Sequence, residues 1–466
     1  MATSLGSAPF TLAILGLLAI VAQMPAAPPA EQLPASSKPN IVFILADDLG
    51  FGDLSCYGQK QFQTPHIDRL AAQGTRFTNF YAGSTVCAPS RCVLMTGLHT
   101  GHCLIRGNGN VNLRPEDVTV AELLHAAGYR TALVGKWGLG QEKSPGVPTR
   151  KGFDAFFGYL DQAHAHNYYP TYLLRNENRV PLRNVVPKEG PAGQGVATQR
   201  IDYSPDLMTK EALAFVEANK SRPFFLELAY TLPHANNEAG NKGMEVPDLG
   251  AFRERNWPEP QKGLAAMIAH LDNGVGQLLD QLKELGLEEN TLVLFSSDNG
   301  PHKEGGNDPA FFHSSGGLRG IKRALYEGGI RVPFIARWPG HVPAGRTSDY
   351  VGWFADFLPT AADLADAPAP PNLDGLSLKP LLTGNAAAQV PHRFLYWEFY
   401  ERGSAQAVRE PRWKGVCQPM DGPIELYDLQ LDPMESHNVA ARNPDVVARI
   451  RQEMREAHVP SALWKK

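Results

Sequence analysis

The chain has little cysteine, no excess of charge of either sign and no internal repeat. Its five cysteines among 466 residues are an odd number, so one stays unpaired if the others form disulfides, and the sequence does not define which would pair. Its 44 Lys and Arg nearly balance its 48 Asp and Glu, and the two signs are interspersed. Because nucleic-acid binding needs a concentrated basic surface, this composition argues against a nucleic-acid partner.

The sequence also lacks an apolar run long enough to span a bilayer comfortably. Residues 11–22 (TLAILGLLAIVA) form an apolar segment of twelve, followed by small residues and prolines as far as Ala30. This pattern predicts a secretion signal over residues 1–30, although the first ten residues contain no Lys or Arg. An uncleaved anchor or a misplaced start is the alternative. Cleavage would leave an exported chain, periplasmic or secreted (lysosomal in a eukaryote), with no stable membrane insertion.

The remaining chain alternates between β-rich and helical patterns. With 43% hydrophobic and 20% charged residues it is long enough for a large core, and its size suggests one large domain and a smaller one. The predicted strands are residues 40–46, 131–135, 223–230, 291–297 and 332–338. The predicted helices are residues 65–74, 119–129, 204–220 (capped by Ser204) and 265–286. This order predicts an α/β fold, a mostly parallel sheet flanked by helices.

A change of composition indicates a boundary near the C-terminus. Residues 367–391 are rich in Pro, Ala and Gly, and residues 394–400, 412–416 and 424–429 then read as strands of a small antiparallel sheet with a closing helix. We therefore predict a catalytic domain over residues 38–366, a linker over 367–391 and a C-terminal α+β subdomain over 392–466.

Polar side chains follow four of the predicted strands. Asp47 and Asp48 come after residues 40–46, and Lys136 follows 131–135. His234 and the pair Asp298 and Asn299 come after the next two strands. Because ligands bind at the carboxyl ends of the strands in open α/β sheets, we expect these groups to meet at one edge.

The acidic residues in this set predict a metal site. Asp47, Asp48 and Asp298, with the amide oxygen of Asn299, would place about three negative charges together, which requires a hard cation among them. Calcium or magnesium fits an all-oxygen set, whereas zinc would favour His or Cys. The alternative is that both segments are turns, since Asp, Asn and Gly favour turns.

Three cations are candidates to face this metal. Arg91, Lys136 and Lys322 would form a trap for a tetrahedral oxyanion such as sulfate or phosphate, and would stabilise charge that develops during ester cleavage. An isolated lysine is usually a solvated surface charge. Lys136, however, lies between an apolar strand and Trp137, in a segment with little reason to be exposed.

The segment CAPSRCVLMTG, residues 87–97, connects the predicted metal ligands and cations with a known family. Its Cys-Ala-Pro-Ser-Arg run followed by Thr96 and Gly97 resembles the type I sulfatase signature, with Met95 where that signature has leucine. The resemblance extends over nearly the whole mature chain, through residues 39–58, 135–140 (GKWGLG), 152–159, 296–300, 322–331 and 426–438.

The resemblance implies an alkaline-phosphatase-like fold and hydrolysis of an aryl sulfate or a sulfated saccharide. In such enzymes a separate formylglycine-generating enzyme oxidises the signature cysteine, here Cys87, to Cα-formylglycine, whose hydrate is the nucleophile. A thiolate would leave a thiosulfate ester with no easy exit, whereas a geminal diol can collapse to the aldehyde and expel sulfate.

Roles for individual residues follow from the same resemblance. Arg91 would orient the diol, Lys136 and Lys322 would grip sulfate, and His234 would protonate the leaving oxygen or bind beside it. The calcium ligands, with magnesium as the alternative ion, would be Asp47, Asp48, Asp298, Asn299 and modified Cys87.

One position departs from the family pattern. The family segment reads Gly-Lys-Trp-His-Leu-Gly, and its histidine assists collapse of the sulfated intermediate, whereas this chain has Gly138 there. We hypothesise that His164 or His166 supplies the missing imidazole or contacts substrate; ordinary surface histidines are the alternative. A phosphonate or phosphodiester hydrolase of the same superfamily and a pseudoenzyme that binds sulfated glycans remain alternative functions.

The substrate pocket is expected in variable loops. Residues 140–150, 175–200 and 236–258 are rich in Pro, Gly, Asn and charge. Three tyrosines at positions 168, 169 and 172 would line a sugar-stacking wall or belong to the core.

Overall fold

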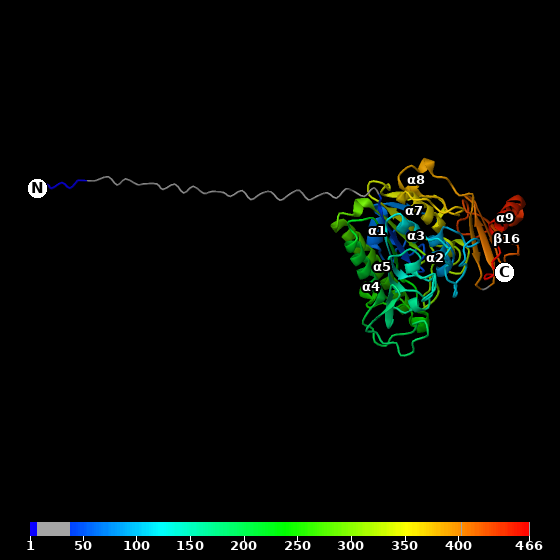
Figure 1. Ribbon diagram of the computed structural model, residues 1–466, viewed down its shortest axis with the longest axis horizontal. Coiled ribbons are helices and arrows are strands. Elements are labelled where there is room, and N and C mark those ends of the chain that lie inside the picture. Colours follow the sequence, from blue (N-terminus) through cyan, green and yellow to red (C-terminus); the bar gives the residue numbers. More distant parts are fainter. Residues whose placement is uncertain (7–37, 402, 466) are drawn as a thin grey trace. The chain divides into compact units, whose positions relative to one another are not determined.

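The computed structural model describes residues 1–6, 38–401 and 403–465 (Figure 1). The predicted signal, residues 1–30, therefore lies outside the described residues apart from its first six. Residues Ser36–Lys466 form one compact unit. Among the described helices, none combines the length and the apolar character needed to cross a bilayer.

A ten-stranded sheet forms the centre of this unit. The strands follow the order β11 (Arg346–Ser348), β2 (Thr75–Phe77), β10 (Phe334–Arg337), β9 (Thr291–Ser297), β1 (Asn40–Ala46), β8 (Phe224–Ala229), β4 (Arg130–Lys136), β5 (Ala155–Tyr159), β6 (Tyr172–Arg175) and β7 (Asn178–Pro181). The five strands from β9 to β5 are parallel to one another. The mostly parallel α/β sheet predicted from the sequence is therefore confirmed.

The central strands are buried on both faces because helices cover both sides. Along β1, Ile41, Phe43 and Leu45 enter one apolar core, and Val42 and Ile44 enter the other. The first core also contains residues of α2 (Cys87–Thr96), α3 (Val120–Ala126) and α7 (Phe357–Ala365). The second contains residues of α1 (Pro65–Ala72), α4 (Ser204–Ala218) and α5 (Glu259–Glu284), and Figure 1 shows α4 and α5 running together on that side. Successive side chains of a strand point to opposite faces, so the continuous apolar run from Ile41 to Ala46 serves both cores.

Two details differ from the sequence-based predictions. The strand predicted over residues 332–338 forms β10, but it runs antiparallel to both of its neighbours, β9 and β2. Ser204 is the first residue of α4 and not its cap; Tyr203 precedes the helix, and no side chain caps it. Ser204 is followed by Pro205, which is well suited to the first turn because its missing N–H would have no helical partner there.

The C-terminal part forms the predicted antiparallel sheet. Its order is β13 (Leu395–Phe399), β14 (Ala405–Arg409), β15 (Trp413–Cys417) and β16 (Ile424–Asp428), and α9 (Pro444–Ala457) packs on it. A short two-stranded parallel sheet pairs β3 (Phe80–Tyr81) with β12 (Gly352–Trp353). There are also two short helices, α6 (Glu327–Ile330) and α8 (Lys379–Leu382). The linker predicted over residues 367–391 stays a prediction.

Candidate active site

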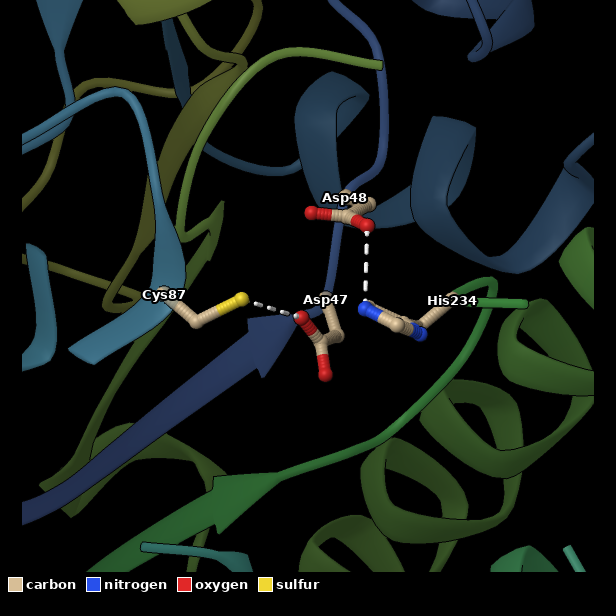
Figure 2. Close-up of side chains that lie close together, drawn as sticks. All are labelled: Asp47, Asp48, Cys87 and His234. Atoms are coloured by element: carbon tan, nitrogen blue, oxygen red, sulfur yellow. Dashed lines mark hydrogen bonds and ion pairs between the residues drawn. The ribbon is translucent and has the colours of Figure 1, made fainter. Parts of the chain in front are cut away.

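The carboxyl ends of the parallel strands bring distant side chains together, as the sequence predicted. Asp47 and Asp48 follow β1, and Cys87 is the first residue of α2. Figure 2 shows the Cys87 sulfur pointing at Asp47 and the His234 imidazole pointing at Asp48. Cys87 Sγ lies 3.5 Å from Asp47 Oδ1, and His234 Nε2 lies 3.4 Å from Asp48 Oδ2. One candidate ligand atom from each of these four residues lies within 4.8 Å of the others.

Asp298 and Asn299, at the end of β9, complete the acidic side of this cluster. The Asp48 amide donates to Asp298 Oδ1 at 3.0 Å, and Asn299 Nδ2 donates to Asp48 Oδ1 at 2.6 Å. Asp48 adopts a left-handed backbone with φ of 64°, which turns its amide toward Asp298. Asn299 Oδ1 is buried and has no hydrogen-bond partner among the described residues. A buried amide oxygen without a donor, beside carboxylates, is an arrangement that a hard cation would satisfy.

Each of the three carboxylates has a buried cationic partner. Arg91 donates to Asp298 Oδ2 through Nε at 3.1 Å and Nη2 at 2.8 Å. Lys136 Nζ lies 2.7 Å from Asp47 Oδ2, and Lys322 Nζ lies 2.7 Å from Asp48 Oδ2. Burial alone would lower the pKa of Lys136 and Lys322, but the adjacent aspartates outweigh it and raise both pKa values. Both lysines therefore stay charged at neutral pH.

The thiol of Cys87 is buried at the start of α2. Burial is the largest influence on this group, and it raises the pKa of the Cys87 thiol well above its ordinary value despite the attraction of Lys136. The unmodified side chain is accordingly a protonated thiol and a poor nucleophile. Ser90, one turn into the same helix, accepts a hydrogen bond from the Gly83 amide at 3.1 Å and so anchors the segment that precedes the helix.

His234 is held on both ring nitrogens. Its Nδ1 lies 2.7 Å from the Ala235 carbonyl oxygen, and its Nε2 lies 3.2 Å from Lys322 Nζ. Tyr168 fixes the backbone by donating to the His234 carbonyl oxygen at 2.5 Å. Burial, followed by repulsion from Lys322, lowers the pKa of His234 well below its ordinary value. The imidazole is therefore neutral.

The two candidate histidines of the 164–166 segment occupy different surroundings. The ring of His166 stacks on that of His234, with centroids 5.0 Å apart and planes 10° apart. His164 is only 2% exposed and packs between Tyr159 and Tyr172. Burial lowers the pKa of His164 to about 4. Of the two, His166 adjoins the cluster, whereas the ring of His164 packs against the two tyrosines outside it.

His164 and Tyr172 instead line a cavity to which none of the cluster residues named above contributes. Its volume is about 550 Å³, and Gln141, Glu142 and Arg179 lie on its wall. Two of the three loops in which the sequence placed the substrate pocket, residues 140–150 and 175–200, contribute to it. Tyr168 and Tyr169 are buried in the second core, so the predicted tyrosine wall reduces to Tyr172.

Gly138 has no side chain, and the side chain of Gln162 occupies the space beside it. Its φ is 78°, and a Cβ placed there would overlap the amide group of Gln162. Gln162 Nε2 is buried without a hydrogen-bond partner among the described residues. The amide of Gln162 therefore takes the space into which a side chain at position 138 would extend.

Sequence reasoning missed two residues beside Lys322. Glu304 Oε2 lies 3.3 Å from Lys322 Nζ, and the His302 ring stacks on His234 with centroids 5.9 Å apart. Burial raises the pKa of Glu304, but Lys322 and Arg323 outweigh it and lower that pKa to about 2. Both residues lie in the segment PHKE, residues 301–304, which follows Asp298 and Asn299 after β9. Their position directly after a strand of the sheet could have identified them as candidates from the sequence.

A second group of candidate metal ligands, remote in sequence, consists of His99, His102 and Asp374. The Gly101 amide donates to His99 Nδ1 at 3.0 Å, so the neutral ring carries its proton on Nε2, which faces Asp374 Oδ1 at 3.6 Å. A metal would need the Nε2 lone pair, and His99 could offer it only as an imidazolate. These residues therefore form a hydrogen-bonded link and not a metal site.

All five cysteines are unpaired. Four are buried, and Cys56 is half-buried. Of the alternatives that the sequence left open, the structure has buried thiols and no disulfide among them.

Comparison with known proteins agrees with this geometry. A family model described as Sulfatase matches residues 39–367, and one described as N-sulphoglucosamine sulphohydrolase, C-terminal, matches residues 320–459. Arylsulfatase A from Homo sapiens is 34% identical, with 93% of this chain and 90% of the relative covered. An N-acetylgalactosamine-6-O-sulfatase from Bacteroides thetaiotaomicron is 31% identical, with 90% and 92% covered.

A solved structure is similar at the level of the fold as well. The crystal structure of Ps i-CgsB has a TM-score of 0.76 and 31% identity, with 90% of this chain and 92% of that chain covered. A second crystal of the same protein contains k-i-k-neocarrahexaose. Since the Sulfatase model covers most of the chain and these relatives align along nearly its whole length, the chain belongs to the sulfatase family of the alkaline phosphatase superfamily and is a sulfuric ester hydrolase.

Proposed function

We propose that this chain removes sulfate from a sulfated saccharide or aryl ester, using the hydrate of a formylglycine made from Cys87. The observation that carries this proposal is the meeting of Cys87, three aspartates and three cations at the carboxyl edge of one sheet. The family assignment supports hydrolysis of a sulfate ester; the nucleophile, the metal and the individual roles are our proposal.

The donor set fits calcium, with magnesium as the alternative. Asp47, Asp48, Asp298, the unpartnered Asn299 Oδ1 and an oxygen of modified Cys87 would hold the ion, and all of these donors are oxygens. When bound, the ion would supply positive charge that polarises the nucleophile and the ester oxygens.

The charge balance around the cluster supports binding of an anion. The three aspartates and the three cations cancel formally, so a bound divalent ion would leave an excess of two positive charges. A sulfate monoester carries one negative charge, and buried, fixed cations stabilise the charge that develops as its ester bond breaks. Lys136 and Lys322 would grip the sulfate oxygens.

The other residues position these groups. Arg91 ties Asp298 to the Lys136 carbonyl oxygen, which it reaches through Nη1 at 2.8 Å, and it would orient the diol beside α2. His234 Nε2 lies 3.2 Å from Lys322 Nζ and can accept a hydrogen bond from it. We therefore propose that His234 holds this lysine beside the leaving group.

Features around the site support a saccharide as the leaving group. The named relatives include an N-acetylgalactosamine-6-O-sulfatase, and Ps i-CgsB has been crystallised with k-i-k-neocarrahexaose. In this chain the cavity lined by His164 also carries Glu142, Arg179 and Tyr172, which are polar and aromatic groups of the kind that bind sugars. We further propose that the chain is exported and matures through a formylglycine-generating enzyme.

Matched substrates test this function. Steady-state rates on aryl sulfate, aryl phosphate and aryl phosphonate esters with one common phenol should favour sulfate, and a calcium chelator should abolish turnover until calcium is restored. Preference for a phosphorus ester would favour the alternative hydrolase. Binding of sulfated saccharides without turnover by fully converted protein would identify a pseudoenzyme.

A further inference from the structure

The helix that begins with Cys87 is capped from outside. Val86, the residue before α2, makes no side-chain cap. In the first turn, the Ser90 amide donates to the Val86 carbonyl oxygen at 3.3 Å, and Pro89 has no amide hydrogen. The Ala88 amide, next to Cys87, is a donor that the helix cannot satisfy by itself, because the first amides of a helix have no carbonyl partner within it.

Asn108 supplies the missing acceptor from a separate segment. Its Oδ1 accepts from the Ala88 amide at 3.0 Å, although twenty positions in the sequence separate the two residues. The side-chain oxygen that satisfies such an amide usually belongs to the residue directly before the helix. Since the Ala88 nitrogen belongs to the same peptide group as the Cys87 carbonyl, this hydrogen bond fixes the backbone that carries residue 87.

The loop that contains Asn108 is held by the segment that follows α9. We call residues 104–109 the capping loop. Trp464 donates through Nε1 to the Leu104 carbonyl oxygen at 2.8 Å. A Cβ at Gly107 would lie 2.7 Å from the Trp464 ring, so this ring packs directly on the backbone of the capping loop. Both contacts are made by one side chain that is remote from Asn108 in the sequence.

A buried arginine makes a second connection between the same segments. Arg106, only 4% exposed, donates through Nη1 to the Val459 carbonyl oxygen at 2.7 Å, and the same atom lies 3.1 Å from Glu398 Oε2 on β13. The Val459 amide donates to the Gly101 carbonyl oxygen at 3.3 Å. The capping loop is thus attached both to the C-terminal sheet and to residues 459–464.

We infer, on the basis of the proposed function, that Asn108 is a positioning residue for the nucleophile at position 87 and that Trp464 acts on this nucleophile through the capping loop. Without its acceptor, the Ala88 amide turns toward water and the first turn of α2 frays. A nucleophile that is displaced by about 1 Å can lose roughly 10²-fold in rate. The segment after α9 therefore takes part in orienting the nucleophile, although it lies outside the central sheet.

Hydrogen exchange tests the connection between the two segments without an assay of activity. In Asn108→Ala and in Trp464→Ala, we expect a peptide that covers Ala88 to exchange about fivefold faster, the factor that loss of a helix cap typically has on local opening. Asn108→Asp keeps an acceptor oxygen and should exchange at the rate of the parent chain. Leu463→Ala, at a position 56% exposed beside Trp464, is the control. Parent-like exchange in Trp464→Ala would overturn the connection.

Steady-state rates of fully converted protein on an aryl sulfate test the consequence for catalysis. We expect Asn108→Ala to lower kcat by about 10–100-fold, and Trp464→Ala to lower it by a smaller factor. Asn108→Asp should retain kcat within about threefold, because an aspartate caps a helix as well as an asparagine does. Its added negative charge should raise KM for an anionic ester. If Asn108→Asp has a lower kcat than Asn108→Ala, the side chain contacts the sulfate and the positioning role is wrong.

The double variant Asn108→Ala/Trp464→Ala separates a shared route from independent damage. If Trp464 acts through the capping loop, its substitution adds little to the loss of kcat that Asn108→Ala already causes. Additive losses, or parent-like kcat in Asn108→Ala, overturn the inference while sulfate release by the parent chain still stands. A parent chain without sulfatase activity refutes the proposed function instead, and hydrogen exchange still tests the cap.

Discussion

Lys136 is a buried cation with a single carboxylate partner at 2.7 Å, so its removal has two costs. Asp47 would keep a buried negative charge with only the more distant Arg91, at 3.7 Å, beside it, and the sulfate would lose one of the cations that we propose to hold it. Lys322 has two carboxylate partners, Asp48 at 2.7 Å and Glu304 at 3.3 Å. At the residue scale, therefore, stability and activity depend on the same ion pairs.

We predict that Lys136→Met lowers kcat/KM on an aryl sulfate by about 10²–10³-fold. Thermal unfolding should also begin at a lower temperature, because the buried Asp47 carboxylate loses its nearer cation and keeps only Arg91, at 3.7 Å. Lys60→Met, at an exposed position, is the matched control. A variant that retains activity within about threefold would show that Lys136 does not contact the reacting sulfate.

The sequence predicted the inner residues of the site better than the outer ones. Asp47 and Asp298 directly follow a strand and Lys136 ends one, so all three could be placed, because parallel strands share one carboxyl edge. His164 and His166 could not be told apart, since they lie two residues apart on one 3₁₀ turn and only packing separates their surroundings. Gln162 gave no signal, because its position over Gly138 depends on the path of the backbone.

At the element scale, the junction of β4 and β8 determines where Lys136 lies. Gly135, with φ of 121°, pairs with Ala229 of β8, and a Cβ on Gly135 would overlap the Ala229 carbonyl oxygen. A side chain is excluded here by both conformation and space. Because Lys136 is the next residue, any displacement of this strand moves a cation of the site.

We predict that Gly135→Ala destabilises the chain by about 2–4 kcal/mol, combining left-handed strain with overpacking. Gly128→Ala is the control, since its φ of 90° imposes similar strain but its Cβ would meet open space. Urea unfolding should therefore show a smaller loss for Gly128→Ala, of about 1–2 kcal/mol. Equal losses would mean that contact with β8 has no energetic effect.

Strand β8 also carries a buried carboxyl group, Glu227, which has an unpartnered Oε2 in the described structure. Burial, opposed weakly by Arg91, raises the pKa of Glu227 to about 7 from 4.5. Between these two values the unfolded chain loses this proton and the folded chain keeps it. The group therefore lowers the free energy of unfolding as pH rises from about 4.5 to about 7.

We predict that Glu227→Gln is more stable than the parent at neutral pH, with a gain that grows from about pH 4.5 to 7 and reaches roughly 2–3 kcal/mol. Denaturant unfolding of both proteins at several pH values in this window measures the difference. A difference that does not change with pH would indicate that Glu227 is ionised in the folded state.

Element types were easier to predict than their directions. Apolar runs with β-branched and aromatic residues identified β1, β8 and β9, because these strands are buried on both faces. The direction of β10 could not be predicted in this way, because an apolar run does not define strand direction, and β10 is antiparallel to both β9 and β2.

At the scale of the whole molecule, one buried charge group joins the C-terminal sheet to the active-site segment. Lys414 on β15 lies 2.9 Å from Glu327 Oε1 and 2.9 Å from Glu435 Oε1, and all three side chains are buried. Glu327 begins α6, five residues after Lys322. The C-terminal sheet thus supports the segment that carries Lys322, the lysine that we propose grips the sulfate.

We predict that Lys414→Met destabilises the chain by about 3–5 kcal/mol, because two buried carboxylates lose this cation and Glu327 keeps only Arg331, at 3.5 Å. Activity at temperatures below unfolding should fall as well, since the segment from Lys322 to Glu327 loses its anchor. Lys379→Met, on a half-exposed helix, is the control for thermal unfolding and for kcat. Unchanged kcat in folded Lys414→Met would mean that the C-terminal sheet does not position Lys322.

The most direct test concerns the side chain at position 87. Protein made with and without a formylglycine-generating enzyme is assayed for sulfate release, and the fraction of aldehyde in the peptide that contains Cys87 is measured by mass spectrometry. We predict that the rate rises in proportion to this fraction and that the all-thiol chain is inactive. Equal rates from thiol and aldehyde forms would contradict the account.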